Sequence, residues 1–286
     1  MRKLLTVIIY TLIILLIGRN LSFLPRFQLL SNPNTYATEL ERQTKDTVAK
    51  KKGSYGVSHF DLTSKKGYGI NQDEMFTAAS INKLPIIAAL YYLENRGKID
   101  FDEQITLSEN DIQDYGTGSL RYAELGTTYT LKTLAKLSLK QSDNTAAHIL
   151  ANKIGVATIQ STIEIFGLVQ TDIDNNQTSP SDMTLLLQKI WENQITTPAK
   201  TKELLSFMND TDIEDRIPAD LPSGTVVYHK TGDAVGNLHD VGIIKNGDDI
   251  FILSILTSDI GTDEKATKET ISKIAKDTLT FYQKHR

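Results

Sequence analysis

The chain has 286 residues, of which 40% are hydrophobic and 23% charged, a composition that excludes wholesale disorder. Its net charge of -4, without a basic cluster among aromatic residues, gives nucleic acid no surface to bind. Cysteine is absent and the five histidines have no metal-ligand spacing, so we expect no disulfide, no metal and no other cofactor.

Residues 1–24 are expected to form a signal peptide or a membrane anchor. Arg2 and Lys3 precede an apolar run over residues 4–18, the order of a positive region and a hydrophobic region in export signals. As a helix the run would rise about 22 Å, short of the ~30 Å hydrocarbon core, which favours a signal peptide. No Ala-x-Ala cleavage site follows, and residues 21–24 are again apolar, so an uncleaved anchor stays open. Either alternative places the remaining chain outside the cytoplasm.

Residues 25–51 are expected to be a tether. The sequence is polar from Ser31 to Lys52 and indicates either a flexible connection or a leading helix. We therefore predict a folded domain over residues 52–286.

The domain begins with a predicted hairpin, followed by a helix. Residues 55–62 read as a strand, residues 65–67 as a turn, and residues 68–70 as the start of the returning strand. Apolar residues at helical intervals then predict a helix over 78–95, which Gly97 ends. Ser80 and Lys83 would lie one turn apart on one face of its start.

Further helices and a second group of strands follow. We predict helices over residues 131–139, 145–154, 184–194 and 201–208, within an all-helical subdomain at about residues 100–215. Strands are predicted over 225–230, 241–245 and 250–257, and a last helix over 262–283. Strands at both ends of the domain indicate an α/β sandwich, in which one antiparallel sheet is flanked by helices and carries the helical insertion.

Three short strings stand in a fixed order along the domain: Ser80-Ile81-Asn82-Lys83, Ser142-Asp143-Asn144 and Lys230-Thr231-Gly232. Singly they are typical of a solvated helix start, a turn with a helix cap, and a strand end with a turn. Their joint occurrence, each in a suitable structural setting, indicates instead a site for serine acyl transfer.

The residue types in these strings suit that chemistry. The hydroxyl of Ser80 needs a base, and Lys83 can serve if burial and cationic neighbours keep it partly neutral. Ser142 can relay a proton to the leaving nitrogen, and Lys230 adds the positive potential that favours a neutral Lys83. The backbone N–H groups of Ser80 and Asp233 are expected to form the oxyanion hole.

The set of strings resembles class A β-lactamases and penicillin-binding proteins. The similarity continues through residues 118–130, 142–147, 178–183 and 221–232, and covers about residues 52–286. It implies an α/β sandwich with a helical domain and the site between the two.

The resemblance also assigns roles to substrate-binding residues. Thr231 and Gly232 would bind the substrate along a strand edge, where glycine permits a close approach. Asn144 would contact the substrate amide, and Tyr115 would form a wall of the cleft.

Two charged residues leave alternatives open. Arg216 falls where some family members place the arginine that binds the substrate carboxylate, but a surface ion pair with Asp215 or Glu214 is an equal alternative. Asp233 carries a carboxylate where an anionic substrate should dock, which either shifts substrate preference or means that its side chain points away.

One departure from the family pattern concerns the step after acylation. Class A β-lactamases carry an omega-loop glutamate that activates water, whereas residues 167–178 contain no glutamate. Asp172 or Asp174 could substitute, although an aspartate is one methylene shorter and such acids are often only solvated. Acylation of Ser80 is therefore predicted, and rapid deacylation is not.

Three functions remain open from the sequence. The first is a monomeric class A β-lactamase-like serine hydrolase acting on β-lactams or related amides. The second is a D,D-peptidase or other penicillin-binding enzyme acting on peptidoglycan stem peptides. The third is a binding or sensing module that a β-lactam or peptide acylates once.

Overall fold

The computed structural model describes residues 36–285. The predicted signal peptide or anchor at 1–24, and residues 25–35 of the predicted tether, lie outside the described residues. No helix between residues 36 and 285 is long and apolar enough to cross a membrane.

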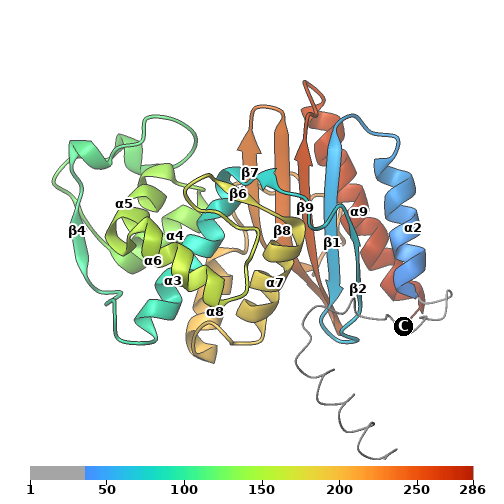
Figure 1. The fold of residues 1–286 in the computed structure, drawn as a ribbon, viewed down its shortest axis with the longest axis horizontal. Coiled ribbons are helices and arrows are strands. Elements are labelled where there is room, and N and C mark those ends of the chain that lie inside the picture. Colours follow the sequence, from blue (N-terminus) through green and yellow to red (C-terminus); the bar gives the residue numbers. More distant parts are fainter. Residues whose placement is uncertain (1–35, 286) are drawn as a thin grey trace, which may run out of the picture. The chain divides into compact units, whose positions relative to one another are not determined.

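A five-stranded antiparallel sheet forms one half of this unit (Figure 1). Its strand order is β2-β1-β9-β8-β7. β1 pairs with β9, and this pairing joins the amino-terminal hairpin to the three carboxyl-terminal strands. The strands are β1 (Ser54–Asp61), β2 (Gly67–Ile70), β7 (Val226–Ala234), β8 (Asn237–Asn246) and β9 (Asp249–Ser258). The prediction of one sheet built from both ends of the domain is thus confirmed, and β7 lies at its edge.

Helices cover both faces of the sheet. α2 (Tyr36–Val48) and α9 (Glu264–His285) lie together on one face, and α7 (Pro180–Trp191) packs on the other (Figure 1). Strand residues such as Val57 and Leu253 are fully buried beneath α2 and α9 in one of two hydrophobic clusters. Burial of this kind on both faces holds the edge strand β7 in a fixed position.

The folded unit begins earlier than the predicted Lys52. Leu40 in α2 is only 1% exposed, and the hydroxyl of Thr44 hydrogen-bonds that of Tyr68 in β2 at 2.8 Å. The predicted start was too late because α2 buries few apolar residues among many charged ones, so its composition looks like that of a tether.

The second half of the unit is a helical layer around α3 (Lys83–Glu94). α3 is nearly buried along its length and follows η1, a 3-10 turn (Ala79–Asn82) that contains Ser80. Around it stand α4 (Leu131–Lys140), α5 (Asn144–Ile154), α6 (Val156–Ile165) and α8 (Pro198–Phe207), with 3-10 turns η2 (Glu109–Asp111) and η3 (Leu120–Tyr122).

The helical subdomain is not all-helical, which corrects the prediction. β4 (Gln104–Thr106) pairs with β5 (Thr128–Thr130), and β6 (Gln177–Thr178) pairs with β3 (Phe76–Thr77). Strands of two or three residues are too short to show the alternation by which a strand is recognised in sequence.

Candidate active site

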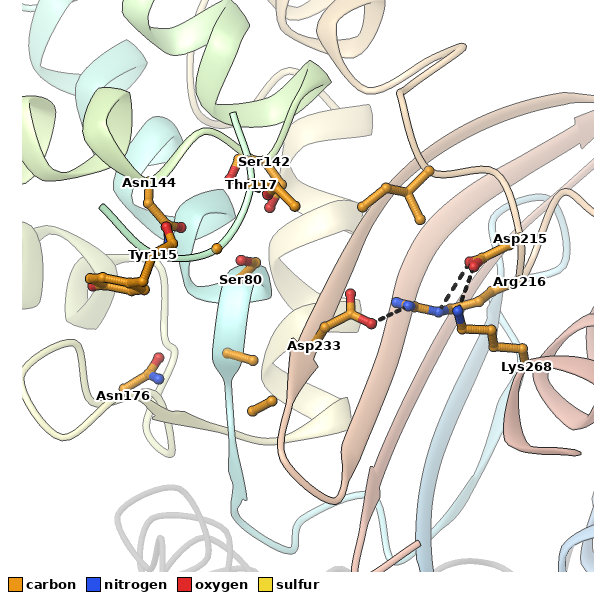
Figure 2. Close-up of a pocket in the computed structure, with 14 residues that line it drawn as sticks. Ser80, Tyr115, Thr117, Ser142, Asn144, Asn176, Asp215, Arg216, Asp233 and Lys268 are labelled. Atoms are coloured by element: carbon orange, nitrogen blue, oxygen red, sulfur yellow. Dashed lines mark hydrogen bonds and ion pairs between the residues drawn. The ribbon is translucent and has the colours of Figure 1, made fainter. Parts of the chain in front are cut away.

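A cleft of about 550 Å³ opens between the sheet edge and the helical layer. Residues of the first two strings line it (Figure 2), and Lys230 of the third string contacts the lining residue Ser142. Its walls include Ser80, Tyr115, Ser142, Asn144, Arg216 and Asp233. Residues far apart in the sequence therefore meet at one place, as the resemblance implied.

Ser80 lies in a turn whose backbone is strained at the preceding residue. Ala79, just before it, has φ +49°, a left-handed conformation that is costly for alanine and is typical of functional turns. The N–H of Ala78 donates to the carbonyl of Asn176 at 2.7 Å. The loop before α7 therefore holds the nucleophile turn from one side.

His239 holds the same turn from the side of the sheet. Its Nε2 contacts the carbonyl of Thr77 at 2.8 Å, and its Nδ1 accepts the N–H of Thr257 at 3.1 Å. These partners require a neutral ring protonated at Nε2, and burial lowers the pKa of His239 to about 4. His239 in β8 pairs with Gly232 in β7. A Cβ added to Gly232 would lie 3.0 Å from the carbonyl oxygen of Ala78, so only glycine fits here without displacing the turn. The sheet edge thus packs directly on the nucleophile turn.

Lys83 is placed to act as the base. Its Nζ lies 3.0 Å from Oγ of Ser80 and 3.1 Å from Oγ of Ser142, and contacts Oδ1 of Asn144 at 2.6 Å. Burial lowers the pKa of Lys83 to about 8, against a smaller opposing effect of Asp143. Asn144 is oriented by its Nδ2, which donates to the carbonyl of Tyr115 at 3.0 Å. A minor neutral fraction of Lys83 is therefore available at pH 7, and a substantial one from about pH 8.

Ser142 connects the two lysines. Its Oγ lies 2.9 Å from Nζ of Lys230 and 3.1 Å from Nζ of Lys83. Ser142 has φ +54°, another left-handed conformation, and the next residue, Asp143, caps α5 by accepting the N–H of Ala146 at 2.8 Å. Burial, and then the charge of Lys83, hold the pKa of Lys230 well below its usual value. One hydroxyl between two such amines can pass a proton in either direction.

Thr231 and Gly232 lie within β7 and are both buried. The strand continues to Ala234, four residues beyond the predicted end, because it pairs with β8 as far as Asn237. Tyr115 lines the cleft and is 63% exposed, as expected for a wall residue. Asp233 and Ser80 both line the cleft, so the two residues predicted to form the oxyanion hole border one space.

Arg216 forms an ion pair with Asp215, as one of the two alternatives expected, but it is buried and does not lie at the surface. The residue is 1% exposed, its Nη1 donates to the carbonyl of His239 at 2.8 Å, and its Nη2 is paired with Asp233. Asp215 lies 3.4 Å from Nε, and Glu214 pairs with a different residue, His229. The carboxylate of Asp233 borders the cleft and binds Arg216, which corrects the alternative that it points away.

Neither predicted substitute for the missing glutamate reaches the cleft. The carboxylate of Asp172 accepts the backbone N–H and Nδ2 of Asn175, each at 2.8 Å, and these bonds lower its pKa. Asp174 is exposed, and neither aspartate lines the cleft. Asn176 is the residue of this loop that lines it, in a left-handed conformation with φ +51°.

Several residues of the site carry no recognisable pattern in the sequence. Asn176, Thr117, Lys268 and His239 are among them. For Asn176 the adjacent asparagines are a weak signal, since asparagine tolerates the left-handed conformation. Lys268 lies on the distant helix α9, and only the fold brings it to the cleft.

Comparisons with known proteins agree with this geometry. The model of the Beta-lactamase enzyme family matches residues 39–282. The chain is 25% identical to Beta-lactamase VEB-1 of Pseudomonas aeruginosa over 276 residues, 87% of this chain and 92% of that protein. It is 26% identical to a beta-lactamase of Bacillus licheniformis over 259 residues, 82% of each chain.

A solved structure is similar over most of the chain. The structure of PBP-A superposes with a TM-score of 0.81 at 26% identity, covering 86% of this chain and 97% of that one. A mutant of PBP-A, which superposes equally well, was solved as an acyl-enzyme complex with penicillin G. This likeness extends to a protein for which a covalent adduct with a β-lactam has been seen.

Proposed function

This chain belongs to the Beta-lactamase enzyme family, and from that membership we propose a class A β-lactamase-like serine hydrolase that acylates readily on Ser80 and deacylates slowly. One observation carries the second half of the proposal. The base and relay around Ser80 are complete, while the loop that should supply a water-activating carboxylate presents Asn176 instead.

Acylation follows from the contacts of four residues. Neutral Lys83 takes the proton of the Ser80 hydroxyl, and Oγ attacks the carbonyl carbon of a β-lactam. The carbonyl oxygen becomes an oxyanion that the backbone N–H groups of Ser80 and Asp233 stabilise. The C–N bond then breaks, and Ser142 passes a proton from Lys83 or Lys230 to the departing nitrogen.

Deacylation lacks a matching group. Water must lose a proton as it attacks the ester, and a side-chain amide such as that of Asn176 cannot accept one. The two carboxylates among the described residues lining the cleft, Asp215 and Asp233, are each held in ion pairs with Arg216. The acyl-enzyme should therefore persist.

The alternative is a D,D-peptidase acting on peptidoglycan stem peptides. β7 is an edge strand, and its exposed end at Asp233 and Ala234 beside the cleft can pair with an extended peptide backbone. The similarity to PBP-A supports this alternative. A sensing module acylated once differs from it only in lacking turnover of any peptide. The peptidase and the sensing module both require acylation of Ser80. They differ in whether the adduct on Ser80 is released, so the fate of this adduct distinguishes them.

We also propose that the enzyme acts outside the cytoplasm. The support is the basic pair Arg2 and Lys3 followed by the apolar run over residues 4–18, whose pattern is that of an export segment.

The test follows both the adduct and its loss. Residues 36–286 are mixed with a chromogenic cephalosporin, and hydrolysis and intact mass are recorded together. We expect one covalent adduct per chain within seconds to minutes and turnover at least 100-fold slower than acylation. Ser80→Ala should abolish the adduct. Absence of an adduct on the wild-type protein would refute the proposal, and rapid sustained turnover would refute slow deacylation.

A second variant tests the cause of the slow step. Asn176→Glu introduces a carboxylate on the cleft wall near Ser80, and deacylation should quicken about tenfold or more. Asn176→Gln, of nearly equal shape but without charge, is the matched control and should leave the adduct persistent. Incubation with an acyl-D-Ala-D-Ala peptide, scored by release of D-alanine, separates the peptidase from the sensing module.

A further inference from the structure

Four charged side chains meet at the end of the cleft beside β7. Asp233 pairs with Arg216, Arg216 faces Asp215, and Asp215 pairs with Lys268 at 2.8 Å (Figure 2). Two positive and two negative charges alternate in this row, which we call the charge row. Its net charge is zero, so it offers no excess positive potential to an anionic substrate.

The guanidinium of Arg216 is held by neighbours within the chain on two of its three nitrogens. The side chain is 1% exposed, its Nη1 donates to the carbonyl of His239, and its Nη2 donates to the carboxylate of Asp233. Nε lies 3.4 Å from the carboxylate of Asp215 and has no hydrogen-bond partner among the described residues. A substrate carboxylate binds an arginine well only when two parallel N–H groups are free. Here it would have to displace Asp233 and then lie beside that like charge.

Asp233 itself faces the cleft. Its side chain is 48% exposed and lines the cleft with Ser80, directly after the strand residues Thr231 and Gly232. One carboxylate oxygen is directed to Arg216, and in Figure 2 the other is turned toward the cleft. A carboxylate is an acceptor only, so the open oxygen suits an N–H donor on the substrate.

Lys230 does not compensate for this negative charge. It is 2% exposed, and burial lowers its pKa, followed by repulsion from Lys83. Its Nζ is directed to the hydroxyl of Ser142 and the carbonyl of Thr231, and it does not line the cleft. The charged side chains that line this end of the cleft are therefore those of the charge row, and Asp233 is the one that directly follows the strand residues Thr231 and Gly232.

We propose that Asp233 is a specificity-determining residue, which makes the end of the cleft beside β7 select a substrate group carrying an N–H donor, a carboxamide or an ammonium, over a carboxylate. This rests on the proposed function, because the group in question belongs to the molecule that acylates Ser80. Arg216 then serves to orient Asp233 rather than to bind the substrate.

The test uses matched ligands that differ only in this group. A cephalosporin or acyl-D-alanyl thioester is prepared with a terminal carboxylate and as its primary carboxamide. Rates of acylation are measured by intact mass, and affinities are measured by titration of Ser80→Ala, which needs no acylation. We expect the wild-type chain to favour the carboxamide at least fivefold in both measurements. Asp233→Asn keeps the shape and backbone of this residue, and should reverse the preference.

A control separates contact from overall charge. Asp215→Asn removes the same charge two positions further along the row, on the other side of Arg216, and should change the preference less than twofold. Equal effects of the two variants, or a carboxylate preference in the wild-type chain, overturn the inference. Since Ser80→Ala reports binding alone, missing acylation of the wild-type protein would refute the proposed function while the affinity ratio still decides the role of Asp233.

Discussion

The amine of Lys83 has four oxygen neighbours, and they can accommodate both of its protonation states. The carbonyl of Ser142 and Oδ1 of Asn144 can only accept hydrogen bonds, so each takes an N–H of the amine. The hydroxyls of Ser80 and Ser142 can donate as well as accept. The ammonium satisfies these neighbours by donating a third N–H to a hydroxyl, and the neutral amine satisfies them by directing its lone pair to a hydroxyl that donates. The neutral form is the one that a general base requires.

The pH dependence of acylation should reflect this lysine. Because burial lowers the pKa of Lys83 to about 8, the acylation rate should rise about tenfold per pH unit below that value and level off above it. In Lys83→Arg the arginine keeps the positive charge but cannot give up its proton, so the acylation rate should fall about 10²–10⁴-fold. Stopped-flow acylation between pH 5.5 and 9.5 measures both. A flat profile would contradict the role of Lys83 as base.

Single residues of the site differ in how far the sequence reveals them. Ser80, Lys83 and Lys230 stand in strings whose residue types and spacing already specify acyl transfer. Asn176 and His239 stand in no such string, because their roles come from tertiary contacts with the turn before Ser80.

At the scale of elements, a buried histidine joins β7 and β8 to the segment before β7. Nδ1 of His229 lies 2.9 Å from Asp240 in β8, and Nε2 lies 3.0 Å from Glu214. Asp240 also accepts the backbone N–H of Ile217 at 3.0 Å. Burial by itself would lower the pKa of His229, but the carboxylates of Asp240 and Glu214 together outweigh burial and raise the pKa to about 9. These contacts fix the segment that carries Arg216.

Stability should depend on pH through this histidine. The pKa of His229 is about 9 in the folded chain and about 6.5 in the unfolded chain, so protonation of His229 stabilises the fold. This stabilisation is fully present below pH 6.5 and is lost as the pH rises through about 9. His229→Gln should lower the free energy of unfolding at pH 6 by roughly 1 to 3 kcal/mol, and by much less at pH 10. Urea denaturation at both values measures this. The partly exposed His148→Gln is the control, and an equal loss at both values would contradict the charged pair.

The prediction of elements from sequence succeeded where periodicity is long. The helix around residues 83–94 and the three strands of the carboxyl portion were predicted, because apolar residues recur at the spacing of each element. The β3–β6 and β4–β5 pairs escaped prediction, since such short strands depend on partners distant in sequence.

For the described unit as a whole, α2 belongs to the fold although it precedes the predicted domain. It packs on β2 and α9, and Leu40 is inserted into the hydrophobic cluster of Tyr68 and Tyr282. A sheet assembled from both ends of the domain needs this cover on its outer face, because exposed apolar strand surface costs free energy.

Truncation should expose this dependence. A chain starting at residue 52 loses α2 and should melt at least about 6 °C below one starting at residue 36, since burial of a leucine such as Leu40 contributes about 2 to 5 kcal/mol. The point variant Leu40→Ala should reproduce most of the loss, and Arg42→Ala on the exposed side of α2 should not. Calorimetry measures the melting temperatures. Equal temperatures for both fragments would show that α2 is dispensable.

The sequence by itself determined the reaction type, because a serine, two lysines and a second serine in ordered strings have few other uses together. It also determined the antiparallel sheet, through the alternation and position of its strands. Only the tertiary structure decided which charged side chains of the site pair with one another. Arg216 and Asp233 are 17 residues apart and pair because β7 and the preceding segment meet, while Asp172 turns into its own loop. Such contacts depend on the packing of distant segments, which no local pattern of residues encodes.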